Sequence, residues 1–155
     1  MSGLTDLEQH QDFMSRALQL AKRATGRTSP NPLVGCIITR GSNIVAEGFH
    51  RRPGAPHAEI EALDNLDVDP KSCRLYVNLE PCCHEGRTSP CTKAIIEAGI
   101  QEVYIGLRDP NPKVDGKGVE ALREAGVTVK GPILPNKSLK LNQPYLKAVS
   151  TDYPW

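Results

Sequence analysis

A histidine, a glutamate and two cysteines stand at spacings that can hold and use a metal ion. His57 and Glu59 open one predicted helix, while Cys82 and Cys91 bracket the start of another. A catalytic zinc site generally offers three protein ligands and leaves the fourth position for water. One imidazole and two thiolates meet that count, and a helix N-terminus favours the thiolate form. The pattern predicts a water-activating metal centre, with Glu59 near enough to exchange protons with the water.

Simpler interpretations of the same residues exist. A His-x-Glu pair or a Pro-Cys pair alone often marks only a helix start. A structural zinc site would be closed by a fourth ligand, for which Cys83 or His84 is available. A structural site has no use for a glutamate beside its histidine, so the combined pattern favours the catalytic class. Cys36 and Cys73 lie in apolar strand patterns and are predicted to be small buried hydrophobic residues.

Length, composition and charge limit the class of protein. The chain has 155 residues, of which 39% are hydrophobic, with 19 Lys and Arg against 18 Asp and Glu. We expect one soluble domain, and the net charge of +1 argues against a nucleic-acid or anionic-membrane partner. The longest apolar stretch is strand-sized, so no membrane span is expected. Five cysteines, an odd number, and an N-terminus without a signal-like pattern predict a cytoplasmic location.

Alternating helix and strand patterns must position the chemical residues. The predicted elements are a helix over residues 6–24, a hairpin of strands over 34–39 and 43–48, a short helix from about 57, strands over 75–79 and 103–107, a strand through Val129 and a helix over 139–149. The strand over 75–79 runs into Cys82 and delivers that ligand. Helix–strand units in the second half predict parallel strands joined by right-handed crossovers.

The spacing of the two cysteines distinguishes this chain from most zinc-dependent nucleobase deaminases. Their pattern is H-x-E followed by P-C-x-x-C, whereas here eight residues separate Cys82 from Cys91. With this insertion the sequence closely resembles the deaminase domain of the bacterial riboflavin-biosynthesis deaminase/reductases. The matching segments are residues 27–36, 48–50, 56–59, 79–91 and 109–112.

The resemblance implies a fold and a set of site residues. The implied fold is an α/β, three-layer α/β/α cytidine deaminase-like fold with a mixed five-stranded sheet. The implied cofactor is Zn²⁺, with His57, Cys82 and Cys91 as metal ligands and Glu59 as the catalytic general acid/base. The implied substrate-binding positions are Asn31, His50, His84, Arg87, Asp109 and Asn111.

Five of the six substrate positions also have an ordinary alternative, and His84 has been named above as a possible fourth zinc ligand. Asn31 and Asn111 precede prolines and are typical turn residues. His50 and Asp109 are compatible with plain strand ends. Arg87 offers a fork-shaped donor set suited to phosphate, and its alternative is a surface ion pair.

The implied reaction is hydrolytic deamination of 2,5-diamino-6-ribosylamino-4(3H)-pyrimidinone 5′-phosphate in riboflavin biosynthesis, with release of ammonia. Two alternatives stay open: a deaminase of cytidine, guanine or tRNA adenosine, and a non-enzymatic binding module with structural zinc. We expect a homo-oligomer, a dimer or tetramer, and a separate or fused reductase. Residues 1–150 are expected to form the deaminase domain and 151–155 a C-terminal tail, where a reductase would begin in bifunctional members.

Overall fold

A five-stranded sheet forms the centre of the molecule in the computed structural model, which describes residues 5–83, 90–112 and 114–150. The strands are β1 (Gly35–Arg40), β2 (Asn43–Phe49), β3 (Arg74–Val77), β4 (Glu102–Ile105) and β5 (Thr128–Lys130). Their order is β2-β1-β3-β4-β5. β1 pairs antiparallel with both β2 and β3, whereas the β3–β4 and β4–β5 pairs are parallel. The predicted mixed sheet, with a hairpin and later parallel strands, is confirmed.

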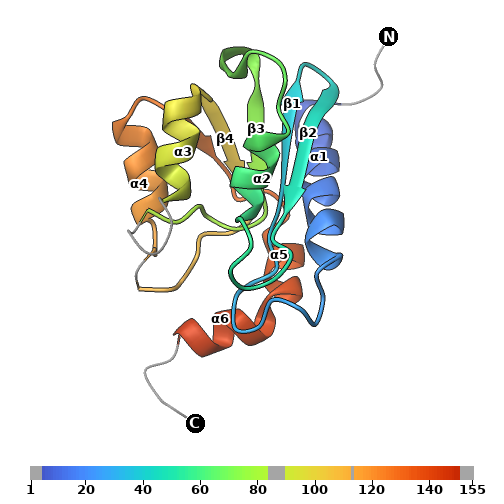
Figure 1. Cartoon of the computed structure of the whole chain (residues 1–155), viewed down its shortest axis with the longest axis vertical. Coiled ribbons are helices and arrows are strands. Elements are labelled where there is room, and N and C mark those ends of the chain that lie inside the picture. Colours follow the sequence, from blue (N-terminus) through green and yellow to red (C-terminus); the bar gives the residue numbers. More distant parts are fainter. Residues whose placement is uncertain (1–4, 84–89, 113, 151–155) are drawn as a thin grey trace.

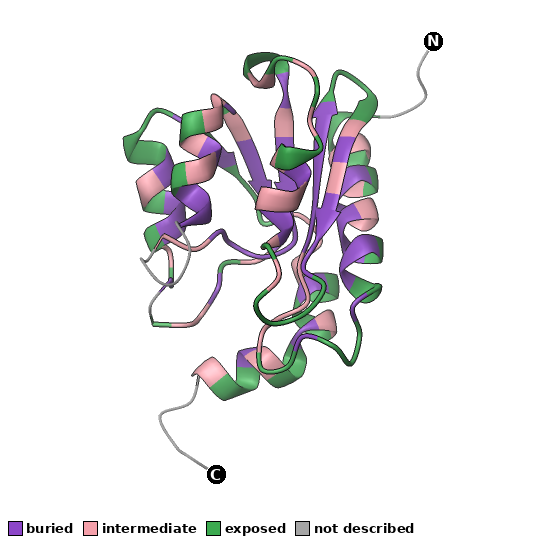
Figure 2. Cartoon of the chain, in the orientation of Figure 1, coloured by how far each residue is buried: buried purple, intermediate pink, exposed green. Residues whose placement is uncertain are grey.

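Helices cover both faces of the sheet, which gives the three layers (Figure 1). One layer holds α2 (Ala58–Asp64), α3 (Cys91–Ala98) and α4 (Lys117–Glu124), and the other holds α1 (Asp6–Lys22) and α5 (Pro135–Leu141). The remaining helices are α6 (Gln143–Ser150) and a short 3-10 turn at Pro70–Ser72. Two apolar clusters lie on opposite sides of the strands, and Figure 2 shows that burial follows the strands and the inner faces of the helices. The expected α/β/α architecture is therefore present.

The sheet topology brings two loops to one edge. β3 and β4 are parallel neighbours, so the loops that follow them leave the sheet at the same end. The loop after β3 contains Cys82, and the loop after β4 contains Asp109 and Asn111. Carboxyl ends of neighbouring parallel strands are where open α/β sheets generally bind ligands. The fold thus places the metal-ligand loop beside a loop of predicted substrate contacts.

The C-terminal segment differs from the prediction of one helix over residues 139–149. It forms two helices, α5 and α6, separated at Asn142. Asn142 is buried, and its side chain bonds the backbone of Leu33, 109 residues earlier. A tertiary contact therefore sets the break, and Pro144 fits the first turn of the new helix because its missing N–H is not needed there. No helix among the described residues has the length and apolar character needed to cross a membrane.

Candidate active site

The three predicted zinc ligands come from separate segments and meet at one point. His57 is the N-cap residue of α2, Cys82 lies in the loop after β3, and Cys91 is the first residue of α3. The His57 Nδ1 atom lies 3.1 Å from the Cys91 Sγ atom and 3.9 Å from the Cys82 Sγ atom. All three ligand atoms lie within 4.8 Å of one another. Two helix starts and the loop after β3 thus converge to make one cluster.

This cluster has the dimensions and the chemistry of a zinc site. A tetrahedral zinc bound to sulfur and imidazole nitrogen holds its ligand atoms about 3.5–3.8 Å apart, close to the spacings found here. Thiolates are the sulfur form that binds metal. A hydrogen bond from the Cys91 thiol, together with one from His57, lowers the pKa of Cys82 to about 4, so one thiolate is already favoured in the metal-free chain. His57, Cys82 and Cys91 therefore fit zinc.

The cluster has an open rather than a closed ligand set. Within residues 5–83, 90–112 and 114–150, His57, Cys82 and Cys91 are the only group of three metal-ligating side chains this close together. Cys83 is among these residues and does not belong to the group. The other candidate for a fourth ligand, His84, lies outside the described residues. Three ligands are typical of a catalytic zinc site, which keeps a position for water.

Glu59 lies beside the cluster in the first turn of α2. Its side chain is buried, with 4% of the residue exposed. Burial, followed by the negative charge of Cys82, raises the pKa of Glu59 to about 7 in the metal-free chain. A carboxyl group that is close to half protonated near neutral pH can both accept and donate protons. Glu59 therefore has the position and the environment of a general acid/base.

A cavity of about 250 Å³ opens next to the cluster. Its lining contains His57, Glu59 and Cys82, together with four predicted substrate positions, Asn31, His50, Asp109 and Asn111. Apolar side chains, including Val34, Leu79 and Val114, form part of the same surface. A small concave site with apolar walls and a few polar groups is typical of small-molecule binding. The other two predicted positions, His84 and Arg87, lie outside the described residues.

His50 is held in one tautomer by its neighbours. Its Nδ1 atom lies 3.1 Å from the Pro56 carbonyl oxygen, which can only accept, so Nδ1 carries the proton. The Nε2 atom then accepts a hydrogen bond from Asn31 Nδ2 at 3.1 Å. Burial lowers the pKa of His50, which agrees with a neutral ring. Asn31 and His50 thus form one polar unit on the cavity wall. The His50 ring contacts the His57 ring edge-on, so this unit lies next to the predicted zinc ligands.

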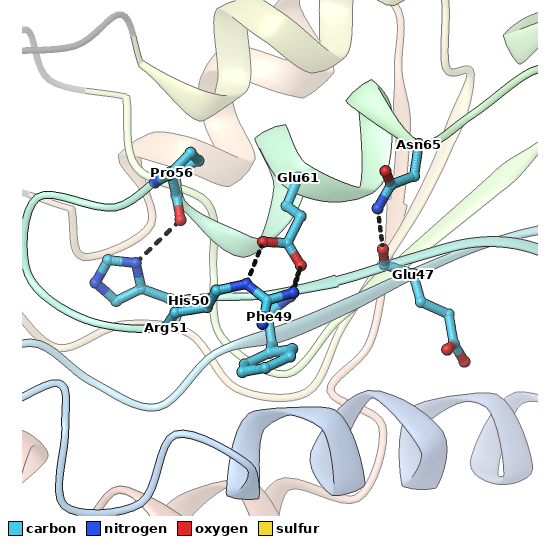
Figure 3. Close-up of polar contacts among 7 residues, drawn as sticks. All are labelled: Glu47, Phe49, His50, Arg51, Pro56, Glu61 and Asn65. Atoms are coloured by element: carbon cyan, nitrogen blue, oxygen red, sulfur yellow. Dashed lines mark hydrogen bonds and ion pairs between the residues drawn. The ribbon is translucent and has the colours of Figure 1, made fainter.

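Contacts between β2 and α2 fix the helix that presents His57 and Glu59 (Figure 3). The Arg51 guanidinium donates two hydrogen bonds of 2.9 Å to the Glu61 carboxylate, which also accepts the Phe49 N–H. Gly48 allows the close approach, because a Cβ there would lie 2.6 Å from backbone atoms of α2. Arg51 therefore helps to hold α2 in place.

The loop after β4 is fixed by Glu80, which sequence reasoning missed. Glu80 is buried, and its carboxylate accepts the backbone N–H groups of Asp109, Gly116 and Val119 at 3.0–3.1 Å. The sequence did hold a signal for this role: Glu80 is a charged residue that directly follows the predicted apolar strand and lies two residues before Cys82. Asp109 in turn accepts the backbone N–H of Asn111 at 2.9 Å, as in an Asx turn. Asp109 thus shapes a turn and also lines the cavity.

Tyr145 is a second cavity residue that the sequence did not indicate. It comes from α6, 36 residues after Asp109, and its hydroxyl lies 2.9 Å from the Asp109 Oδ2 atom. The C-terminal segment therefore forms part of the cavity wall.

Cys36 and Cys73 are buried in the apolar cluster beneath α2, α3 and α4, which confirms their prediction as core residues.

Comparison with known proteins identifies the family. Residues 7–107 match the family model described as the cytidine and deoxycytidylate deaminase zinc-binding region. The chain belongs to the cytidine and deoxycytidylate deaminase family. The matched region of this deaminase family contains His57, Glu59, Cys82 and Cys91, so the predicted zinc cofactor is confirmed by the family and by the fit of the cluster.

Within the deaminase family, several similar proteins are named as riboflavin-biosynthesis enzymes. Riboflavin biosynthesis protein RibD from Synechocystis sp. is 49% identical over 145 residues, which are 94% of this chain and 39% of the relative. A diaminohydroxyphosphoribosylamino-pyrimidine deaminase from Buchnera aphidicola subsp. Schizaphis graminum is 46% identical over 92% of this chain and 97% of the relative. The structure of RibD from Acinetobacter baumannii superposes with a TM-score of 0.92 at 45% identity, covering 97% of this chain and 42% of that chain. The resemblance and the fold predicted from sequence are confirmed.

Proposed function

We propose that this chain catalyses the zinc-dependent hydrolytic deamination of 2,5-diamino-6-ribosylamino-4(3H)-pyrimidinone 5′-phosphate in riboflavin biosynthesis. The observation that carries the proposal is the buried Glu59 beside His57, Cys82 and Cys91 at the wall of a small cavity. The substrate class comes from the names of the similar proteins, above all the Buchnera deaminase, which this chain covers almost completely. The chain spans 39% of the Synechocystis RibD protein. Other activities of that protein are therefore not assigned to this chain.

The residues around the cavity divide the work of the reaction. Zinc bound by His57, Cys82 and Cys91 would activate a water molecule for attack. Glu59 accepts a proton from that water and delivers it to the ring nitrogen beside the amine-bearing carbon. The water oxygen bonds to the amine-bearing carbon, and Glu59, now deprotonated again, takes the remaining proton of that oxygen and passes it to the exocyclic amino group. The carbon–nitrogen bond then breaks, the amino group leaves as ammonia, and the carbonyl forms. The product is the corresponding pyrimidinedione, and no oxidant or reductant is consumed.

The polar groups on the cavity wall would bind the substrate. Asn31 and His50 offer one fixed donor–acceptor unit, and Asp109 and Asn111 offer a second. Arg87 is assigned to the 5′-phosphate and His84 to the pocket mouth, because the residues between the two cysteines are expected beside the metal. Oligomerisation, a fused or separate reductase and a cytoplasmic location remain predictions from the sequence.

A panel of aminopyrimidines, scored by ammonia release from the zinc-loaded protein, tests this proposal. The panel contains the ribosyl and ribityl diaminopyrimidinones with and without phosphate, plus cytidine, deoxycytidylate and guanine. We expect the phosphorylated diaminopyrimidinones to be deaminated with the highest kcat/KM. Activity confined to cytidine or deoxycytidylate would favour the other activity named in the family description. Retained zinc without ammonia from any compound would indicate a structural zinc module.

A further inference from the structure

Helix α6 contributes to the cavity although it lies outside the matched family region. That region ends at residue 107, whereas Asp109, Asn111 and Tyr145 all follow it and all line the cavity. Figure 1 shows α6 at the end of the molecule where the loops leave the sheet, apart from the layers that cover it. The matched region therefore supplies the metal ligands and Glu59, and the following segment supplies polar groups of the other wall.

One end of α6 is attached to the loop before β1. The Asn142 side chain accepts the Leu33 N–H at 2.7 Å and donates to the Leu33 carbonyl oxygen at 2.8 Å. Asn142 is 3% exposed, and Leu146, one turn into the helix, is also buried. The same loop carries Asn31 and Val34, which line the cavity. The position of α6 is therefore set by the cavity-forming loop itself.

The next contact of α6 reaches the opposite loop. The Tyr145 hydroxyl donates to the Asp109 carboxylate, at 2.9 Å from Oδ2 and 3.3 Å from Oδ1, and it accepts from Asn111 Nδ2 at 3.5 Å. Burial raises the pKa of Tyr145 to about 12, so the hydroxyl keeps its proton at neutral pH and stays a donor. A hydrogen bond to a charged acceptor is about twice as strong as a neutral one. Tyr145 thus orients both polar side chains of this loop.

We propose that Tyr145 is a positioning residue for substrate binding, which holds Asp109 and Asn111 in the geometry that the substrate meets. A tyrosine needed only for packing would not direct its hydroxyl to a carboxylate on the cavity wall. The inference rests on the proposed function insofar as it assigns Asp109 and Asn111 to the substrate. It adds that specificity depends on α6, a helix outside the matched family region.

Replacement of Tyr145 by Phe tests the inference, because it removes the hydroxyl and keeps the ring. We expect KM for the deaminated substrate to rise about tenfold while kcat stays within about twofold, since binding is affected and the zinc–Glu59 chemistry is not. Tyr104→Phe is the matched control: it removes a hydroxyl that bonds Glu102, neither residue lines the cavity, and KM should stay unchanged. Thermal unfolding of both variants checks that each remains folded.

A double-mutant cycle with Asp109→Ala separates positioning from general loosening, because alanine leaves the Tyr145 hydroxyl no side-chain acceptor at position 109. If Tyr145 acts through Asp109, Tyr145→Phe should change KM by less than about twofold in the Asp109→Ala background. Equal effects of Tyr145→Phe in both backgrounds, a fall in kcat with unchanged KM, or a similar KM rise in Tyr104→Phe would overturn the inference. If the wild-type protein deaminates a different compound of the panel, the proposed function fails. The same variants are then compared on that compound, so the role of Tyr145 is decided separately.

Discussion

Two walls of the cavity differ in how they are held. The metal wall carries His57 and Cys91, at the starts of α2 and α3. The opposite wall carries Asp109 and Asn111, in a loop that α6 contacts through Tyr145. The metal wall is fixed by helices that pack on the sheet and by the ion pair of Arg51 with Glu61. The opposite wall is fixed by individual hydrogen bonds, chiefly those of Glu80 and Tyr145. His57, Glu59 and Cys91 therefore belong to helices that pack on the sheet, whereas Asp109 and Asn111 belong to a loop held by single side chains. One fold can keep its chemistry and change its substrate in this way.

Loss of a metal ligand should have the largest effect. We expect His57→Ala, Cys82→Ala or Cys91→Ala to remove zinc and ammonia release together, because two remaining ligands cannot hold a catalytic zinc. Cys83→Ser is the matched control, since Cys83 lies outside the three-residue cluster. Zinc content by elemental analysis and ammonia release are measured on each protein. Stoichiometric loss of zinc from Cys83→Ser would mean that the ligand set is wrong.

Glu80→Gln should loosen the opposite wall. The amide can accept on one side only, so at least one of the three N–H groups that Glu80 satisfies is left without a partner. We expect a loss of at least about 2 kcal/mol in the free energy of unfolding and a higher KM, with zinc retained. Denaturant unfolding and zinc content are the measurements, with Glu120→Gln, an exposed glutamate of α4, as control. Loss of zinc with unchanged stability would show that Glu80 serves the metal wall instead.

Arg87→Ala tests whether recognition extends to the phosphate. Charge-assisted hydrogen bonds to phosphate are strong, so we expect KM for the phosphorylated substrate to rise about tenfold. The dephosphorylated analogue loses no contact and should be bound as before. Steady-state kinetics on both compounds give the comparison. Equal effects on the two substrates would mean that Arg87 does not contact the phosphate.

A surface pair remote from both walls should have the smallest effect. Arg16 bonds Glu47 at 2.6 Å between α1 and β2, with both side chains 32% exposed. The hydrogen bond from Arg16 lowers the pKa of Glu47, so the pair stabilises the fold above the ordinary pKa of a glutamate and loses this contribution as the pH falls through the lowered value. Arg16→Gln should therefore cost less than about 1 kcal/mol at pH 7 and less at pH 3 than at pH 7. Denaturant unfolding at both pH values measures the difference. KM at pH 7 should be unchanged, since the pair touches neither wall of the cavity, and a raised KM would contradict this.

Residue spacing alone indicated the residues of the metal wall, whereas Asp109 and Asn111 of the opposite wall were predicted only through the family resemblance and Tyr145 was not predicted. His57 and Glu59 are two residues apart, and Cys82 follows a recognisable strand, so local pattern was sufficient. Tyr145 meets Asp109 only through a contact between segments 36 residues apart, and helical periodicity alone does not tell which cavity a helix borders. The break between α5 and α6 was missed for the same reason, because it depends on the contact of Asn142 with Leu33. Local spacing predicts helix starts, whereas packing of the last helices is decided by the whole fold.

Comparison of wild-type protein with Glu59→Gln, both loaded with zinc, tests the central claim most directly. Glutamine keeps the size of the side chain but cannot take up the proton, so only the chemistry should change. Zinc content and ammonia release from the phosphorylated diaminopyrimidinone are measured on the same samples. We predict equal zinc and a fall in kcat of at least about 10²–10⁴-fold in Glu59→Gln, the range typical of a general acid/base. Near-normal turnover of the zinc-loaded variant would contradict the assignment of Glu59 and the mechanism built on it.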